Sequence, residues 1–135
     1  MGLIVLSVED DDATFYTIHM AFKELPLSVH LLRAKSGTEA LSLLHKQTIS
    51  ESDSQNPDLV LLDLNLPGLS GLDVLAAMKT DRKLALIPVV VFSSSSREQD
   101  RKESLALGAQ QYITKPNTFD GVIQALKAAC SGITT

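Results

Sequence analysis

The sequence predicts an α/β protein built on a parallel sheet of five strands that is covered by five helices. Five short runs rich in Leu, Val and Ile alternate with segments whose apolar residues recur at helical spacing. Most of these runs are apolar throughout, which is typical of strands buried on both faces. Alternating strands and helices favour a sheet with helices on both sides. The 135 residues fit one domain, and we expect a single domain over residues 1–135 with no second domain.

Two strands, each followed by a helix, are predicted in the N-terminal part of the chain. The apolar run Leu3–Val8 is the first strand. Asp12–Leu25 follows as a helix with apolar residues at helical spacing and an acidic first turn, which the helix dipole favours. The second strand is predicted at Ser28–Ala34, and the second helix begins at Ser36 and runs to about Lys46.

A polar segment separates these elements from the third strand. Residues 47–57 lack apolar periodicity and are predicted to form an exposed loop. The third strand, Leu59–Asp63, is an apolar run that ends abruptly in a carboxylate. Ser70 is predicted to cap a third helix that runs to about Lys79.

The C-terminal part is predicted to add two strands and two helices. Pro88–Phe92 is an apolar run that four serines follow. Arg97–Leu107 is a mostly polar helix that ends at Gly108, a residue typical of helix C-termini. Gln111–Thr114 is the short fifth strand, and Phe119–Ser131 is the last helix, with one apolar face.

Composition and charge exclude several classes of protein. The net charge of -4 and a pI near 5.2 argue against direct nucleic-acid binding, which needs a basic surface. The single cysteine, Cys130, cannot form an internal disulfide, and no Cys/His metal spacing occurs. The N-terminal apolar run is short and no basic region precedes it, so we expect no signal peptide, and no segment approaches the roughly 20 apolar residues of a membrane span. We therefore expect a cytoplasmic protein without membrane or nucleic-acid partners.

Polar side chains follow four of the five predicted strands at the point where each strand ends. Glu9 and Asp10 follow the first strand, Asp63 ends the third, Ser93 follows the fourth, and Lys115 follows the fifth. The carboxyl ends of parallel strands meet at one edge of a sheet, where ligands of α/β proteins bind. If the first and third strands are neighbours, the three acids lie close together.

The chemistry of these side chains points to a cation and a phosphoryl group. Two carboxylates about 4 Å apart repel by roughly 4 kcal/mol at an effective dielectric near 20, and a divalent cation removes that repulsion. Oxygen ligands and retained water favour Mg²⁺. An ammonium and a hydroxyl suit phosphoryl oxygens, and an Asp carboxylate can itself accept the group as an aspartyl phosphate. The neighbouring Asp12 is interpreted as a helix N-cap, not as a ligand.

Four motifs carry a resemblance to a known family. They are Val8-Glu9-Asp10-Asp11, Asp63-Leu64-Asn65-Leu66-Pro67 with Gly71, Val91-Phe92-Ser93-Ser94, and Tyr112-Ile113-Thr114-Lys115-Pro116. In this order and at these intervals, the whole chain resembles a response-regulator receiver domain of two-component signalling. The resemblance implies a flavodoxin-like fold with strand order 2-1-3-4-5. Three of the motif phrases resemble stand-alone regulators that partner phytochrome-type kinases.

The resemblance implies roles for the acids. Asp63 would be the phosphoacceptor, taking a phosphoryl group from a sensor histidine kinase. Glu9 and Asp10 would hold Mg²⁺ together with Asp63 and the backbone carbonyl of Asn65. Glu9 stands where Asp is frequent in the family.

The resemblance also implies a switch. Lys115 would pair with the phosphoryl group across a cis bond to Pro116, Ser93 would be the switch hydroxyl, and Tyr112 the switch aromatic. The surface of the fourth helix, fifth strand and fifth helix would change. A downstream protein, a phosphotransfer protein or a homodimer would then receive the signal. Asn117 stands where Phe is usual, so aromatic packing there is lost unless Phe119 supplies it.

Two alternatives to this signalling switch remain open. An aspartate-nucleophile phosphatase would carry a second Asp two positions after the nucleophile, where this chain has Asn65. A degenerate receiver would act as a scaffold without phosphorylation. We expect a switch that phosphorylates and dephosphorylates itself, not an enzyme with sustained turnover.

Overall fold

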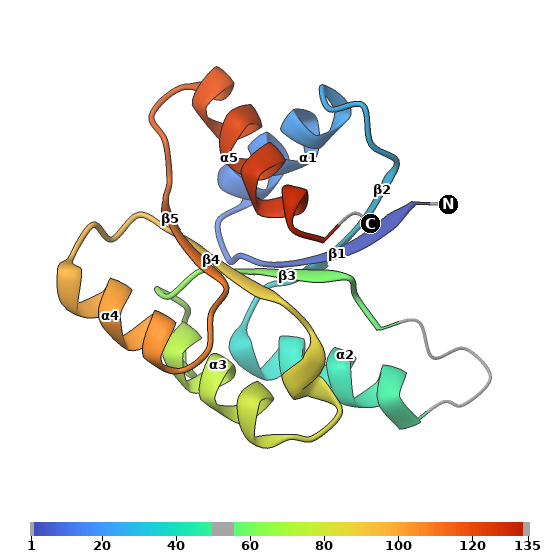
Figure 1. Ribbon diagram of the computed structural model, residues 1–135, viewed down its shortest axis with the longest axis vertical. Helices are drawn as coiled ribbons and strands as arrows, with labels where there is room; N and C mark the ends of the chain where they lie inside the picture. The colour runs from blue at the N-terminus through green and yellow to red at the C-terminus, as the bar shows by residue number, and fades with distance from the viewer. Residues whose placement is uncertain (1, 50–55, 134–135) are drawn as a thin grey trace.

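A computed structural model describes residues 2–49 and 56–133 and shows one parallel sheet of five strands. The strands are β1 (Leu3–Val8), β2 (Val29–Ala34), β3 (Leu59–Leu62), β4 (Val89–Ser93) and β5 (Gln111–Thr114). Their order is β2-β1-β3-β4-β5, and all neighbouring pairs are parallel (Figure 1). The fold class and the strand order implied by the resemblance are both confirmed. The reversal of strand order between β1 and β3 places the ends of these two strands side by side.

Helices cover both faces of this sheet. One face carries α1 (Asp12–Lys23) and α5 (Phe119–Ser131), and the other carries α2 (Gly37–Ile49), α3 (Gly71–Thr80) and α4 (Glu98–Ala106) (Figure 1). A short 3-10 helix, Leu84–Leu86, precedes β4 and was not predicted.

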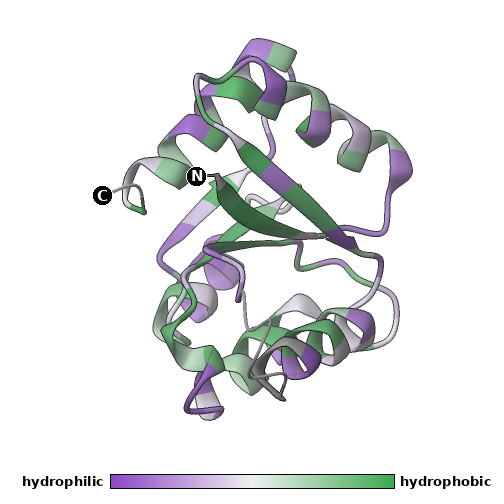
Figure 2. Cartoon of the chain, turned by 90° about the vertical axis from the view of Figure 1, so that its right-hand side faces the viewer, coloured by the Kyte–Doolittle hydropathy of each residue, from purple (hydrophilic) through white to green (hydrophobic). Residues whose placement is uncertain are grey.

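Two apolar cores lie on opposite faces of the sheet. Because side chains alternate along a strand, neighbours such as Leu61 and Leu62 in β3 enter different cores. Leu62 packs with the α2 and α3 side, which includes Met78, and Leu61 packs with Phe22 and Leu126 of α1 and α5. Figure 2 shows the strands as mostly hydrophobic and the helices as mixed. A sheet buried on both faces holds the ends of its strands rigidly.

Element boundaries differ from the predictions at a few positions. Helix α1 ends at Lys23, because the N–H groups of Glu24 and Leu25 donate to carbonyls three residues back and tighten the chain into a turn. Asp11, not Asp12, is the N-cap, and its carboxylate accepts from the N–H of Thr14 at 2.8 Å.

The predicted loop at 47–57 was placed too early in the chain. Helix α2 continues to Ile49, because backbone hydrogen bonds can extend a helix beyond its apolar face. Residues 50–55 of that loop lie outside the described residues. Ser70 caps α3 as predicted, and its hydroxyl accepts from the N–H of Asp73 while the Asp73 carboxylate accepts from the N–H of Ser70.

Candidate metal and phosphoryl site

The polar residues predicted at the strand ends meet at the carboxyl edge of the sheet. Backbone hydrogen bonds that continue the sheet hold three of them. Glu9 donates its N–H to β2 at 2.9 Å, Asp63 donates to β1 at 3.2 Å, and Lys115 donates to the carbonyl of Ser93 at 2.8 Å. Their backbones are therefore fixed by the sheet, and only their side chains are free to respond to a ligand.

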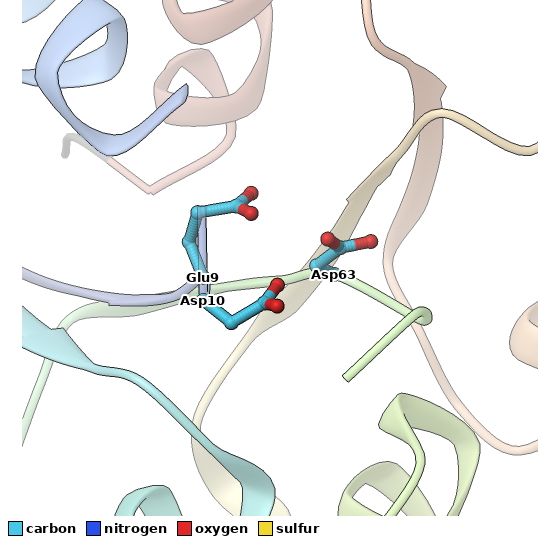
Figure 3. Close-up of side chains that lie close together, drawn as sticks. All are labelled: Glu9, Asp10 and Asp63. Carbon is cyan, nitrogen blue, oxygen red and sulfur yellow. The ribbon is translucent and has the colours of Figure 1, made fainter. Parts of the chain in front are cut away.

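Three carboxylates gather at this edge. Oxygen atoms of Glu9, Asp10 and Asp63 all lie within 4.8 Å of one another. Glu9 and Asp63 are buried, at 2% and 5% exposed, whereas Asp10 is exposed. Figure 3 shows the acids at the ends of β1 and β3 reaching toward a common space. The three-acid group is therefore open to solvent on the side of Asp10.

The ammonium of Lys115 lies between the two buried acids. Its Nζ is 2.8 Å from Oε1 of Glu9 and 3.2 Å from Oδ2 of Asp63. Burial raises the pKa of Glu9 above its ordinary value, although the hydrogen bond from Lys115 opposes this effect. Burial alone would lower the pKa of Lys115, but the two carboxylates outweigh it, so that the pKa is raised and the ammonium stays charged.

The donor set fits a hard divalent cation. Every side chain of the three-acid group offers oxygen, and one ammonium among three carboxylates leaves two negative charges uncompensated. Asn65 follows Asp63 closely and donates its N–H to Oδ1 of Asp63 at 3.2 Å. The part expected of the Asn65 carbonyl in binding the cation stays a prediction.

The predicted switch residues are connected through Ser95. Ser93 is fully buried, and its hydroxyl accepts from the N–H of Ser95 at 3.4 Å. The Tyr112 hydroxyl donates to the carbonyl of Ser95 at 2.7 Å, and the Ser95 hydroxyl donates to the carboxylate of Asp100 in α4. Ser95 was not singled out from the sequence. Its only signal was its place in the run of four serines.

One expectation that followed from the resemblance is corrected. The bond between Lys115 and Pro116 is trans, and Lys115 reaches both acids from it; a bond before proline is more stable in the trans form by about 0.5–1 kcal/mol. The sequence left open whether Phe119 supplies the aromatic packing lost at Asn117, and Phe119 is 44% exposed. Both residues line a cavity of about 350 Å³ beside Lys115.

Comparison with known proteins identifies the family. The sequence profile of the response regulator receiver domain matches residues 5–127. The chain belongs to this family. One relative is Response regulator Rcp1 of Synechocystis sp. (strain ATCC 27184 / PCC 6803 / Kazusa), to which the receiver is 37% identical over 124 residues. The aligned residues cover 92% of this chain and 84% of Rcp1.

Solved structures agree with this assignment. The phosphorylated cyanobacterial phytochrome response regulator RcpA is 34% identical, with a TM-score of 0.86, over 99% of this chain and 98% of RcpA. The Mn(2+)-bound form of Rcp1 is 31% identical, with a TM-score of 0.84, over 98% of this chain and 96% of that chain. The receiver is therefore a regulator of two-component phosphorelays, whose partner is a histidine kinase.

In its described residues no helix is long and apolar enough to cross a membrane.

Proposed function

We propose that the receiver accepts a phosphoryl group from a histidine kinase on Asp63 in a reaction that depends on Mg²⁺. The contact of Lys115 with both Asp63 and Glu9, beside the three-acid group, carries this proposal. The site combines a nucleophilic carboxylate, a fixed ammonium and a set of oxygen ligands. Glu9, Asp10, Asp63 and the carbonyl of Asn65 would hold the ion.

In the proposed reaction a carboxylate oxygen of Asp63 attacks phosphorus, and the bond between phosphorus and the kinase histidine breaks. When bound, Mg²⁺ would supply positive charge to the phosphoryl oxygens and to the acids. The ammonium of Lys115 exchanges its contact with Asp63 for a contact with a phosphoryl oxygen. Its contact with Glu9 holds the ammonium in place. The N–H of Asn65, now 3.2 Å from Oδ1 of Asp63, orients the nucleophile.

The proposed output runs from Ser93 to α4. The Ser93 hydroxyl moves to a phosphoryl oxygen and gives up the N–H of Ser95. Because Ser95 also accepts from Tyr112 and donates to Asp100, its displacement changes the surface of α4, β5 and α5. Phosphorylation biases an existing equilibrium between two arrangements of this surface.

The proposed partners follow from the relatives. Similarity to Rcp1 and to the cyanobacterial phytochrome response regulator RcpA supports a phytochrome-like kinase. We further propose that the signal passes to a separate protein, a phosphotransfer protein or a second copy of the receiver, as the resemblance to stand-alone regulators implies. Asn65 at the position of a phosphatase's second Asp supports a switch, not an enzyme of sustained turnover. The cytoplasmic location stays a prediction.

The proposal is tested with Mg²⁺ and beryllofluoride, a phosphoryl mimic, followed by NMR. We expect shifts at Ser93, Ser95 and Tyr112 only when both reagents are present. Asp63→Asn should abolish them, and Asp120→Asn, which changes an exposed acid in α5, should leave them unchanged. Incubation with a small phosphodonor should add the mass of one phosphoryl group to the unaltered protein and to Asp120→Asn, but not to Asp63→Asn.

Two outcomes would favour the alternatives. Continuous hydrolysis of a phosphate ester that Asp63→Asn abolishes would support a hydrolase. Normal binding to the partner by Asp63→Ala, with no response to beryllofluoride in the unaltered protein, would support a scaffold.

A further inference from the structure

Arg33, near the end of β2, makes three contacts with the residue that follows β1 and with the first turn of α1. Its Nε donates to the backbone carbonyl of Glu9 at 3.1 Å, and its Nη1 lies 2.9 Å from Oδ1 of Asp12. The guanidinium also lies over the ring of Phe15, 4.7 Å from the centroid. The side chain is only 18% exposed. A backbone carbonyl, a carboxylate and an aromatic ring thus all contact the guanidinium.

The carbonyl held by Arg33 belongs to the peptide between Glu9 and Asp10. Both acids are in the three-acid group, so the hydrogen bond acts on the backbone from which both carboxylates project. The N–H of Glu9 is fixed by β2 on one side of the residue. Arg33 fixes its carbonyl on the other side. After Glu9 the chain leaves the sheet, and the hydrogen bond from Arg33 holds the backbone where no strand pairing does.

The remaining nitrogen of Arg33 shows that this arrangement is not the best one for stability alone. Its Nη2 is buried and has no hydrogen-bond partner in the described part of the chain. A buried donor without an acceptor lowers stability. Rule-breaking side chains of this kind occur at functional sites, where position matters more than stability.

We propose that Arg33 is a positioning residue for the divalent cation: it fixes the Glu9–Asp10 peptide so that both carboxylates face the ion. The inference rests on the proposed function, because it concerns the same site. Residues that orient metal ligands typically change metal affinity by about 10–100-fold when they are altered. Arg33 would act in this way through a backbone carbonyl and not through a ligand side chain.

Electrostatics alone predicts the opposite effect. A positive charge near a cation site repels the ion, so neutralising Arg33 would tighten Mg²⁺ binding if charge were all that mattered. Losing the bond to the Glu9 carbonyl would instead loosen the acids and weaken binding. The two explanations therefore differ in the sign of one measurement.

The experiment measures the Kd for Mg²⁺ by calorimetric titration of the full chain. Arg33→Met, which keeps an unbranched side chain but removes the charge and the donors, should raise the Kd by about tenfold. Arg33→Lys keeps the charge but not the planar guanidinium, and it should fail to restore affinity. Arg82→Met, an exposed arginine in the turn after α3, is the matched control and should leave the Kd unchanged.

Stability is measured alongside by thermal unfolding without Mg²⁺. A merely structural role would lower the midpoint of Arg33→Met and leave the Kd of the folded protein unchanged. An unchanged or lower Kd in Arg33→Met, or full affinity in Arg33→Lys, would overturn the positioning role. Should Arg33→Met fail to fold, Arg33→Lys decides alone. Absence of Mg²⁺ binding in the unaltered protein would overturn the proposed function itself. Normal Mg²⁺ binding without phosphorylation of Asp63 would overturn the proposed function but leave the positioning role of Arg33 intact.

Discussion

Lys115 controls the electrostatics of the site, because its ammonium separates two buried carboxylates. We expect Lys115→Met to destabilise the Mg²⁺-free protein by about 2–3 kcal/mol, since Glu9 and Asp63 would face each other without a counter-charge. Saturating Mg²⁺ should recover most of this loss by supplying positive charge. Urea unfolding with chelator and with Mg²⁺ measures both values.

Lys127→Met is the control for this prediction. Lys127 is exposed on α5, and its loss should change the free energy of unfolding by less than about 0.5 kcal/mol under either condition. Equal destabilisation by the two substitutions, or a loss at Lys115 that Mg²⁺ does not reduce, would contradict the role of Lys115 as a counter-charge.

Single residues of the site differed in how far the sequence could predict them. Glu9, Asp10, Asp63 and Lys115 come together as expected, because each directly follows a strand and the ends of parallel strands meet at one edge. The role of Arg33 was not predictable. It depends on which way a side chain in the neighbouring strand points and on a backbone carbonyl as its partner.

At the scale of elements, the start of α3 packs directly on the end of β3. A Cβ atom at Gly71 would lie 2.3 Å from the carbonyl oxygen of Asp63 and 2.6 Å from Cα of Leu64. We therefore expect Gly71→Ala to cost about 1–3 kcal/mol of stability through overpacking and to weaken Mg²⁺ binding, because Asp63 must move. Chemical unfolding and Mg²⁺ titration measure the two effects.

Gly68→Ala is the control, because it replaces a glycine that makes no close contact with another residue. Gly68 has a φ of 71° with open space around it, so alanine there meets only the backbone cost, about 1 kcal/mol. Its Mg²⁺ affinity should equal that of the unaltered protein. Normal Mg²⁺ affinity in Gly71→Ala would show that the contact with Asp63 does not control the site.

Helix α4 buries no apolar side chain. Its sole buried residue is the polar Ser104, whose hydroxyl donates to the carbonyl of Asp100 at 2.8 Å. Helix α3, by contrast, buries Val74, Leu75 and Met78. We expect amide hydrogens of α4 to exchange with deuterium faster than those of α3 or α5, because opening α4 exposes little apolar surface. Mass spectrometry of peptides measures this, and equal protection of α3 and α4 would contradict it.

Elements with a strong apolar pattern were predicted closely, and those held by hydrogen bonds less so. The strands Leu3–Val8 and Gln111–Thr114 and the helix Phe119–Ser131 have the predicted bounds. The end of α2 was misplaced, because backbone hydrogen bonds extend it without an apolar signal. The 3-10 helix Leu84–Leu86 is too short to show a periodicity.

At the scale of the whole molecule, the sheet joins the site to the stability of the fold. An ion that binds only the folded chain stabilises it by mass action, by about 2.7 kcal/mol at a hundred times its Kd. We expect Mg²⁺ to raise the midpoint of thermal unfolding and Asp10→Asn to reduce this shift. Asp10 is exposed, so its replacement should not prevent folding.

Glu24→Gln is the matched control for the thermal experiment, since Glu24 is an exposed acid at the far end of α1. Its shift with Mg²⁺ should equal that of the unaltered protein. Equal shifts in all three proteins would mean that Mg²⁺ stabilises the fold from a place other than the three-acid group.

The architecture as a whole was only partly contained in the sequence pattern. Alternating strands and helices predict a parallel sheet covered on both faces, because each apolar run must be buried. The order of the strands is decided by contacts between segments far apart in the chain, such as Val5 with Leu59. No local pattern reports such contacts, and only the resemblance implied the order.

The bond between Tyr112 and the Ser95 carbonyl gives this receiver a built-in optical probe. The chain has two tyrosines and no tryptophan, and the other tyrosine, Tyr16, is 63% exposed on α1. A Tyr16→Phe variant would therefore emit ultraviolet fluorescence from Tyr112 alone. A phenol hydroxyl that loses its acceptor changes its absorption and emission, so the state of the proposed switch could be read in real time without any attached dye.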